Sequence, residues 1–317
     1  MKKALVVGID DYSSSPLNGC VNDANAIANT IERNGDGSSN FSVKLITSPG
    51  DITRSSLKEA IEKLFDGESD MALLYFSGHG FIKSTGGYLV TIDTEDTDRY
   101  DEGVSMDEIL TLANESKAKN KVIILDCCHS GALGSPRING SNIAQLSEGL
   151  SVLTASRDTE YAMEVEGAGV FTSLVVDALK GGASDLRGNI TPGSLYAYVD
   201  EALGAWDQRP IFKTNVSSFI SLRSIPPKIP FETMRKITTY FDAPESEFKL
   251  DPSYEYTEKT AIKHNIKIFK DLQKFQSVGL VIPVDAEFMY FAAINSKSCR
   301  LTALGYQYWR LVNEKKL

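Results

Sequence analysis

Two short motifs of chemically active residues each follow an apolar stretch of the sequence. Residues 73–76 run into Ser-Gly-His-Gly at 77–80, and residues 122–125 run into Asp-Cys-Cys-His-Ser-Gly at 126–131. A thiol needs a neighbouring base or cation to become a nucleophilic thiolate, and imidazole suits that role near neutral pH. The two motifs therefore indicate nucleophilic catalysis by a cysteine that is paired with His79.

The elements that must position these motifs read as a layered α/β fold. Apolar strand patterns at 4–9, 42–47, 71–76, 121–125 and 150–154 alternate with helical patterns at 22–33, 54–65, 171–179 and 192–203. This alternation predicts a doubly wound α/β domain with a mostly parallel central sheet. Because the carboxyl ends of parallel strands share one edge, where such folds place ligands, we expect the histidine and the cysteine to face each other there.

The glycines around His79 suit the same chemistry, because they let the backbone approach a substrate closely. Attack of a thiolate on a carbonyl develops an oxyanion, which backbone N–H groups can stabilise. The amides of Gly80 and Cys128 are the expected donors.

Residues 1 to about 225 resemble the caspase-like fold of clan CD cysteine peptidases, and are most similar to metacaspases and bacterial caspase-like proteins. Four motifs carry the resemblance in the family's order: VGID at 7–10, LNGCVNDA at 17–24, SGHG at 77–80 and DCCHSG at 126–131. His79 and Cys128 are 49 positions apart, which agrees with the roughly 50 typical of caspases. The resemblance implies Cys128 as nucleophile and His79 as catalytic histidine. Cys127, one residue earlier on the strand, should point to the opposite side.

The resemblance also implies a substrate class. Metacaspase-like enzymes cut after arginine or lysine because carboxylates line the primary specificity pocket, and the matching positions are Asp23 and Asp126, with Ser77 as a further substrate-binding residue. A guanidinium would pair with these carboxylates through charge-assisted hydrogen bonds. The sequence leaves open the alternative that Asp23 only caps its helix and that Asp126 only ends a strand.

A polar segment at 134–149 lies where caspases are often cleaved, which makes Arg137 a candidate self-processing site. A plain exposed loop is the alternative, because nicking is tolerated in any such loop. No cofactor is expected to be required, although metacaspases often bind calcium. The spacing of the acidic residues in the run at 93–102 matches no calcium loop and favours a solvated acidic segment. These residues are Asp93, Glu95, Asp96, Asp98, Asp101 and Glu102.

A proline-rich connector at 225–230 marks a domain boundary. The predicted domains are a peptidase domain over 1–224, a linker and helical connector over 225–257, and a winged-helix-like regulatory or sensor domain over 258–317. The last domain is expected to contain a helix at 258–276, strands at 280–284 and 288–294, and a closing segment at 301–309.

Charge and composition limit the partners. Residues 1–225 carry 19 Lys and Arg against 31 Asp and Glu, which should repel nucleic acid and attract basic ligands, whereas 226–317 carry 14 against 11. No apolar run reaches the roughly 20 residues that cross a bilayer, and the first strand does not read as a signal peptide. The four cysteines suit neither a disulfide scaffold nor a zinc site. A cytoplasmic protein without membrane contact is expected.

Three functions from different classes fit the sequence. The first is an endopeptidase that cuts polypeptides after basic residues. A signal nucleotide or a partner protein at the C-terminal domain would regulate it, because bacterial caspase-like proteases of this sort resemble effectors of anti-phage defence. The second is a catalytically weak caspase-like scaffold, which would more typically have lost the cysteine or the histidine. The third is a DNA-binding regulator acting through the winged helix, which the weak basic charge of that domain disfavours.

Overall fold

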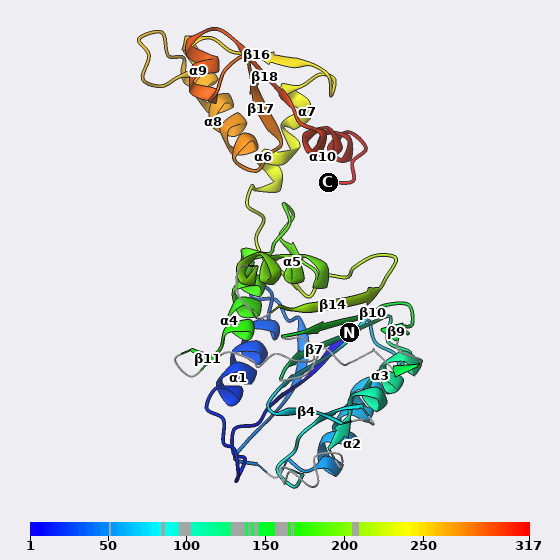
Figure 1. Ribbon diagram of the computed structural model, residues 1–317. Coiled ribbons are helices and arrows are strands. Elements are labelled where there is room, and N and C mark those ends of the chain that lie inside the picture. The colour runs from blue at the N-terminus through cyan, green and yellow to red at the C-terminus, as the bar shows by residue number, and fades with distance from the viewer. Residues whose placement is uncertain are drawn as a thin grey trace. The chain divides into compact units, whose positions relative to one another are not determined.

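The computed structural model describes most of the 317-residue chain. Contacts between residues divide it into two compact units, Met1–Asp185 with Asn189–Ile225 and Leu186–Gly188 with Pro226–Leu317 (Figure 1). The described residues are 1–50, 52–83, 86–94, 103–127, 145–155, 169–204 and 209–317, with the backbone alone at 137–138, 141–142, 164–165 and 168.

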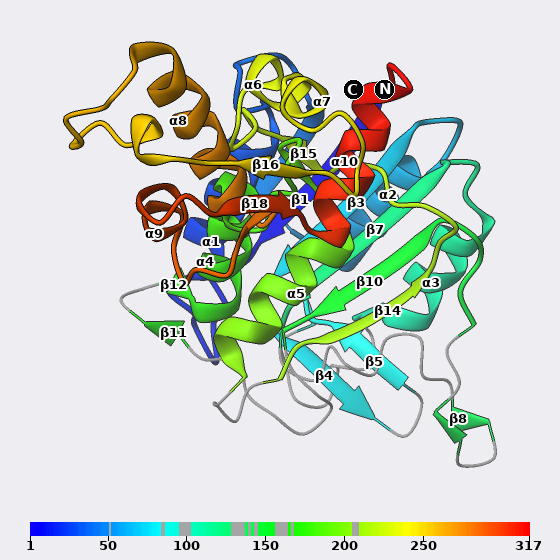
Figure 2. The ribbon, with the colours of Figure 1, turned by 90° about the horizontal axis from the view of Figure 1, so that it is seen from above.

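A six-stranded sheet forms the centre of the first unit. Five of its strands are parallel, whereas the edge strand β14 is antiparallel to β10, beside which it lies in Figure 2. The mostly parallel sheet predicted from the sequence is therefore confirmed. In spatial order the strands are β14 (Ile211–Asn215), β10 (Leu150–Thr154), β7 (Asn120–Asp126), β3 (Met71–Ser77), β1 (Lys2–Gly8) and β2 (Phe41–Thr47).

Helices cover both faces of this sheet, which explains why its central strands are apolar throughout. Leu74 and Ile123 point to one face and pack under two helices, whereas Tyr75 and Ile124 point to the other and pack under three. Figure 1 shows the two groups of helices on opposite sides of the strands. The first group is α2 (Arg54–Phe65) and α3 (Met106–Glu115), and the second is α1 (Cys20–Ile31), α4 (Val170–Asp177) and α5 (Pro192–Leu203).

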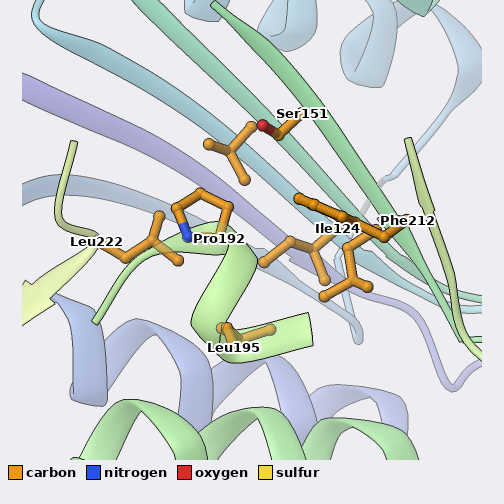
Figure 3. Close-up of a pocket in the computed structure, with 8 residues that line it drawn as sticks. Ile124, Ser151, Pro192, Leu195, Phe212 and Leu222 are labelled. Atoms are coloured by element: carbon orange, nitrogen blue, oxygen red, sulfur yellow. The ribbon is translucent and has the colours of Figure 1, made fainter. Parts of the chain in front are cut away.

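Helix α5, from the group that also contains α1 and α4, packs closely against the sheet. Thr191 caps this helix through its side chain, and Pro192 occupies the first turn, where its missing N–H is no loss. Figure 3 shows Pro192 and Leu195 beside Ile124 and Phe212, and the side chains fill this space so closely that no water fits between them. The space is therefore part of the apolar core.

Short strands form smaller sheets around the central one, and a π-helical segment, η3 (Ala178–Gly182), extends α4. One of these small sheets begins at Gly80, directly after His79. The small sheets are β4 (Gly80–Lys83) with β5 (Gly86–Leu89) and β6 (Val104–Ser105), β13 (Asn189–Ile190) with β15 (Arg223–Ser224), β8 (Arg137–Ile138) with β9 (Ser141–Asn142), and β11 (Glu164–Val165) with β12 (Ala168–Gly169).

Gly8 lets the first strand and the first helix approach each other closely. A Cβ at this position would lie 2.3 Å from the Cys20 carbonyl oxygen and 2.7 Å from the Ala24 Cβ. Two residues later, the Asp10 carboxylate accepts hydrogen bonds from the backbone N–H groups of Cys20 (2.8 Å) and Val21 (3.2 Å) at the start of α1. The Val-Gly-Ile-Asp motif therefore fixes how the chain passes from β1 to α1.

The second unit has its own apolar core, in which Leu272 and Phe275 are buried. Residues 226–257 contribute Met234 and Phe241 to the same core. Nowhere in the described parts of the chain is a helix both long and apolar enough to span a bilayer. The elements of this unit are α6 (Phe231–Arg235), α7 (Ile237–Tyr240), η4 (Pro252–Tyr254), α8 (Lys263–Ser277), α9 (Met289–Ile294), α10 (Ala303–Asn313), and an antiparallel sheet in the order β16 (Glu247–Lys249), β18 (Ser298–Leu301) and β17 (Val281–Val284).

The strand predicted at 288–294 is wrong, because helix α9 begins directly after Phe288 and occupies Met289–Ile294. Met289, Ala292 and Ala293 are buried, and their spacing of three and four residues is that of one helix face. Phe288 and Phe291 are exposed, although their type suggested a buried strand. The winged-helix assignment of this unit stays a prediction.

Replacing Phe275 by alanine is expected to lower the free energy of unfolding of the second unit by about 3–5 kcal/mol, because the ring is fully buried and its loss leaves a cavity. Phe291→Ala removes the same group from a site that is 45% exposed and should change it by no more than about 0.5 kcal/mol. Urea unfolding of both variants, followed by circular dichroism, measures the difference. Equal destabilisation would contradict the described packing.

Candidate active site

The two chemical motifs leave the sheet from neighbouring strands at the same edge. In the parallel register of β3 and β7, Ser77 pairs with Asp126, and the Gly78 N–H donates to the Asp126 carbonyl oxygen at 3.4 Å. His79 therefore stands two residues beyond one member of this pair, and position 128 is two residues beyond the other. Cys128 itself lies outside the described residues.

The His79 imidazole is half-buried and oriented by a backbone carbonyl. Its Nε2 lies 2.7 Å from the Ser15 carbonyl oxygen. Because a carbonyl oxygen can only accept a hydrogen bond, Nε2 is the nitrogen that carries a proton, and Nδ1 is left to exchange a proton with another group. The sequence did not reveal Ser15, because the contact uses a backbone carbonyl that any residue type supplies.

Asp23 of α1 and Asp126 of β7 are brought together, although 103 residues separate them in the sequence. A Cβ at Gly169 would lie 2.8 Å from an oxygen of Asp23 and 2.6 Å from an oxygen of Asp126, so both carboxylates converge on this point. The Gly169 N–H donates to both oxygens of Asp23, at 3.2 and 3.1 Å. Asp23 is 4% exposed and Asp126 is 5% exposed, so the acidic pair is closed to solvent.

The start of α4 holds this acidic pair. The Thr172 hydroxyl donates to Asp126 at 2.7 Å, and because that hydroxyl has one hydrogen, the Tyr75 hydroxyl must be the donor in its 2.6 Å contact with Thr172. Burial raises the pKa of Tyr75 well above its usual value, with Asp126 and Asp23 acting in the same direction. The N-terminal turn of a helix also favours negative charge. Gly169 and Thr172 carried no motif that could have revealed them in the sequence.

Ser77 and Cys20 lie in the same buried polar region. Burial raises the pKa of the Cys20 thiol well above its usual value, against the opposing effect of its hydrogen bond with Ser77. Cys20 therefore stays a neutral thiol near pH 7. Cys127 is buried in the apolar layer between the sheet and helices α2 and α3, on the face opposite to Asp126 and Thr172.

The Gly80 amide points away from its neighbouring strand. The His79 carbonyl oxygen accepts a 3.0 Å hydrogen bond from the Val90 N–H of the segment that continues β5. In a trans peptide, the C=O of one residue and the N–H of the next point to opposite sides. The Gly80 N–H is therefore directed away from β5.

The remaining predicted residues fall largely outside the described part of the chain. Arg137 lies in the short strand β8, paired with Asn142 of β9, but its side chain is outside the description. Asp93 accepts hydrogen bonds from the Arg54 N–H (3.0 Å) and the Thr91 hydroxyl (2.6 Å), and so ties the start of α2 to the segment after β5. Among the described residues, no group of three metal-binding side chains gathers. The acidic residues outside the described ranges are Glu95, Asp96, Asp98, Asp101 and Glu102.

Comparison with known proteins shows the family of this chain and a likeness of fold. The family model of the caspase domain matches residues 1–218. A crystal structure of a protein from Geobacter sulfurreducens is similar with a TM-score of 0.51 and 18% sequence identity, over 72% of this chain and 98% of that chain, which is a likeness of fold. No curated protein matches the chain.

Proposed function

We propose, from the premise that this chain belongs to the caspase domain family of cysteine peptidases, that it cleaves polypeptides after arginine or lysine with Cys128 as nucleophile and His79 as its partner. The observation that carries the proposal is the register of β3 and β7, which pairs Ser77 with Asp126. Chain connectivity ties residue 128 to the end of β7, as it ties His79 to the end of β3.

The orientation of the imidazole supports general acid–base chemistry. With Nε2–H directed at the Ser15 carbonyl, Nδ1 accepts the thiol proton of Cys128, and the thiolate attacks the substrate carbonyl. The imidazolium then donates this proton to the leaving amine as the C–N bond breaks and a thioester remains. Water activated by His79 hydrolyses the thioester and returns the thiol. The direction of the Gly80 N–H supports its role, with the Cys128 amide, as a donor to the oxyanion.

The convergence of Asp23 and Asp126 supports the preference for a basic residue. Two carboxylates beside one point offer a guanidinium or ammonium group several charge-assisted hydrogen bonds. A substrate carboxylate at the same place would be repelled by both. Ser77 and Cys20, which share the region, add polar atoms beside the pair.

The closed state of the acidic pair supports a regulated enzyme. The Gly169 backbone stands where the substrate's cation would bind, so this segment must move before a basic side chain can reach Asp23. A signal or partner acting through the second unit is the activating event that we propose.

The test compares four fluorogenic peptides that differ only in the residue before the cleaved bond, which is Arg, Lys, Gln or Asp. We expect kcat/KM for the Arg and Lys peptides to exceed that for Gln by about 10²-fold or more, because the Gln side chain is polar but carries no charge. The Asp peptide should be the poorest. The rates of the Cys128→Ala variant with the same peptides are the background that is subtracted. Equal cleavage of all four peptides, or a preference for Asp, would overturn the proposed specificity.

A further inference from the structure

Tyr12 lies in the loop after β1 and is buried against the candidate active site. The loop is held in place by its own backbone, because the N–H groups of Tyr12 and Leu17 both donate to the Asp10 carbonyl oxygen at 2.9 Å. The Asp10 N–H in turn donates to the Ser48 hydroxyl at 3.0 Å. The same loop supplies the Ser15 carbonyl that contacts His79.

The Tyr12 hydroxyl connects two backbone segments at the histidine. It accepts a hydrogen bond from the His79 N–H at 3.1 Å and donates one to the Val90 carbonyl oxygen at 3.0 Å. Val90 also donates its N–H to the His79 carbonyl oxygen. Burial raises the pKa of Tyr12 well above its usual value, so the hydroxyl keeps its proton and both bonds persist at neutral pH.

The Tyr12 ring contacts the imidazole directly. The ring centroids of Tyr12 and His79 lie 4.5 Å apart with an angle of 53° between the planes. The imidazole is therefore restricted by the tyrosine ring on one side and by the Ser15 carbonyl at Nε2.

The glycine before His79 fits this arrangement. A Cβ at Gly78 would lie 2.7 Å from the Tyr12 hydroxyl oxygen and 2.9 Å from a ring carbon of Phe76. A side chain at position 78 would displace the hydroxyl from the His79 N–H. The first glycine of the Ser-Gly-His-Gly motif thus makes room for Tyr12.

We propose that Tyr12 is a positioning residue for the His79 imidazole, which it holds through the backbone N–H and the ring face. The proposal rests on the proposed function of His79 as the partner of Cys128. Proton transfer from the thiol requires Nδ1 at a fixed place, and a displacement of about 1 Å can cost about 10²-fold in rate. Tyr12 makes this contribution without touching the reacting atoms.

Tyr12→Phe keeps the ring and removes the hydroxyl. We expect kcat for the arginine peptide to fall by about 10-fold or more while KM changes little, because the imidazole and not the substrate pocket is disturbed. Tyr240→Phe is the matched control: its hydroxyl donates to Asp271 at 2.9 Å within the second unit, so the variant loses a comparable hydrogen bond outside the peptidase domain and should keep wild-type kcat. Thermal unfolding of both variants shows whether either is folded.

A second variant keeps the test sharp if Tyr12→Phe is unstable. Gly78→Ala keeps the tyrosine at position 12, but the added methyl group pushes the Tyr12 hydroxyl away from the His79 N–H. This variant should lower kcat in the same way. Wild-type kcat in folded Tyr12→Phe, with His79→Ala inactive, would overturn the role of Tyr12. A fall in kcat equal to that of Tyr240→Phe would do the same. If His79→Ala cleaves as well as the wild type, the proposed function of His79 fails instead.

Discussion

Cleavage of the arginine peptide is expected to disappear in Cys128→Ala and to persist in Cys127→Ala. Removing the nucleophile of a covalent mechanism should lower kcat by at least about 10³-fold. Cys127 is buried in the apolar layer under α2 and α3, away from the face that carries Asp126. Its replacement should change stability by about 1 kcal/mol and leave kcat near the wild-type value. Initial rates at saturating peptide measure both effects.

Two histidines give a parallel comparison. His79→Ala should lose activity as Cys128→Ala does, whereas His264→Ala, on the exposed side of α8 in the second unit, should retain it. Thermal unfolding of each variant checks that the fold is intact. An inactive Cys127→Ala beside an active Cys128→Ala would transfer the role of nucleophile to Cys127. Activity in all four variants would remove the peptidase assignment of these motifs.

Asp126→Asn is expected to lower kcat/KM for the arginine peptide by about 10- to 100-fold, because a hydrogen bond to a charged group contributes about 1.5–3 kcal/mol. The glutamine peptide has no cation to lose and should be cleaved as before. Asparagine retains an oxygen that can accept the Thr172 hydroxyl, so the local packing should survive. The ratio of the two kcat/KM values is the measurement.

The exposed residue Asp66, at the end of α2, supplies the control for charge alone. Asp66→Asn makes the same change in net charge on an element that does not carry the acidic pair. It should leave the ratio of kcat/KM for the arginine and glutamine peptides unchanged. An unchanged ratio in Asp126→Asn would exclude this carboxylate from the specificity pocket.

Most of the first unit could be predicted from the sequence, and the family match confirms the caspase-like assignment. Strands covered on both faces appear as unbroken apolar runs, and α2 and α5 carry clear amphipathic patterns and caps. β14 was missed because its central residues Phe212 and Lys213 alternate apolar and polar types over a short edge. In the second unit, the aromatic residues on the exposed side of α9 led to the wrong prediction of a buried strand, because aromatic residues are frequent in strands.

The candidate site could be predicted only where its chemistry depends on residue type. The motif around His79 predicted its role from the chemistry of an imidazole, whereas Asp23 and Asp126 were predicted from the resemblance to metacaspases. The Ser15 carbonyl and the Gly169 amide act through the backbone, so no residue type marks them.

In the proposed cation pocket, the amide of Gly169 acts as a tethered competitor for Asp23. A tethered group acts at a high effective concentration, and a pocket that is open for only a fraction of the time binds free ligands correspondingly weakly. A small guanidine compound can displace this amide only through the interaction of its charge with the carboxylates. A polypeptide also brings backbone contacts, which can offset the displacement, so the proposed pocket should favour extended chains over free arginine.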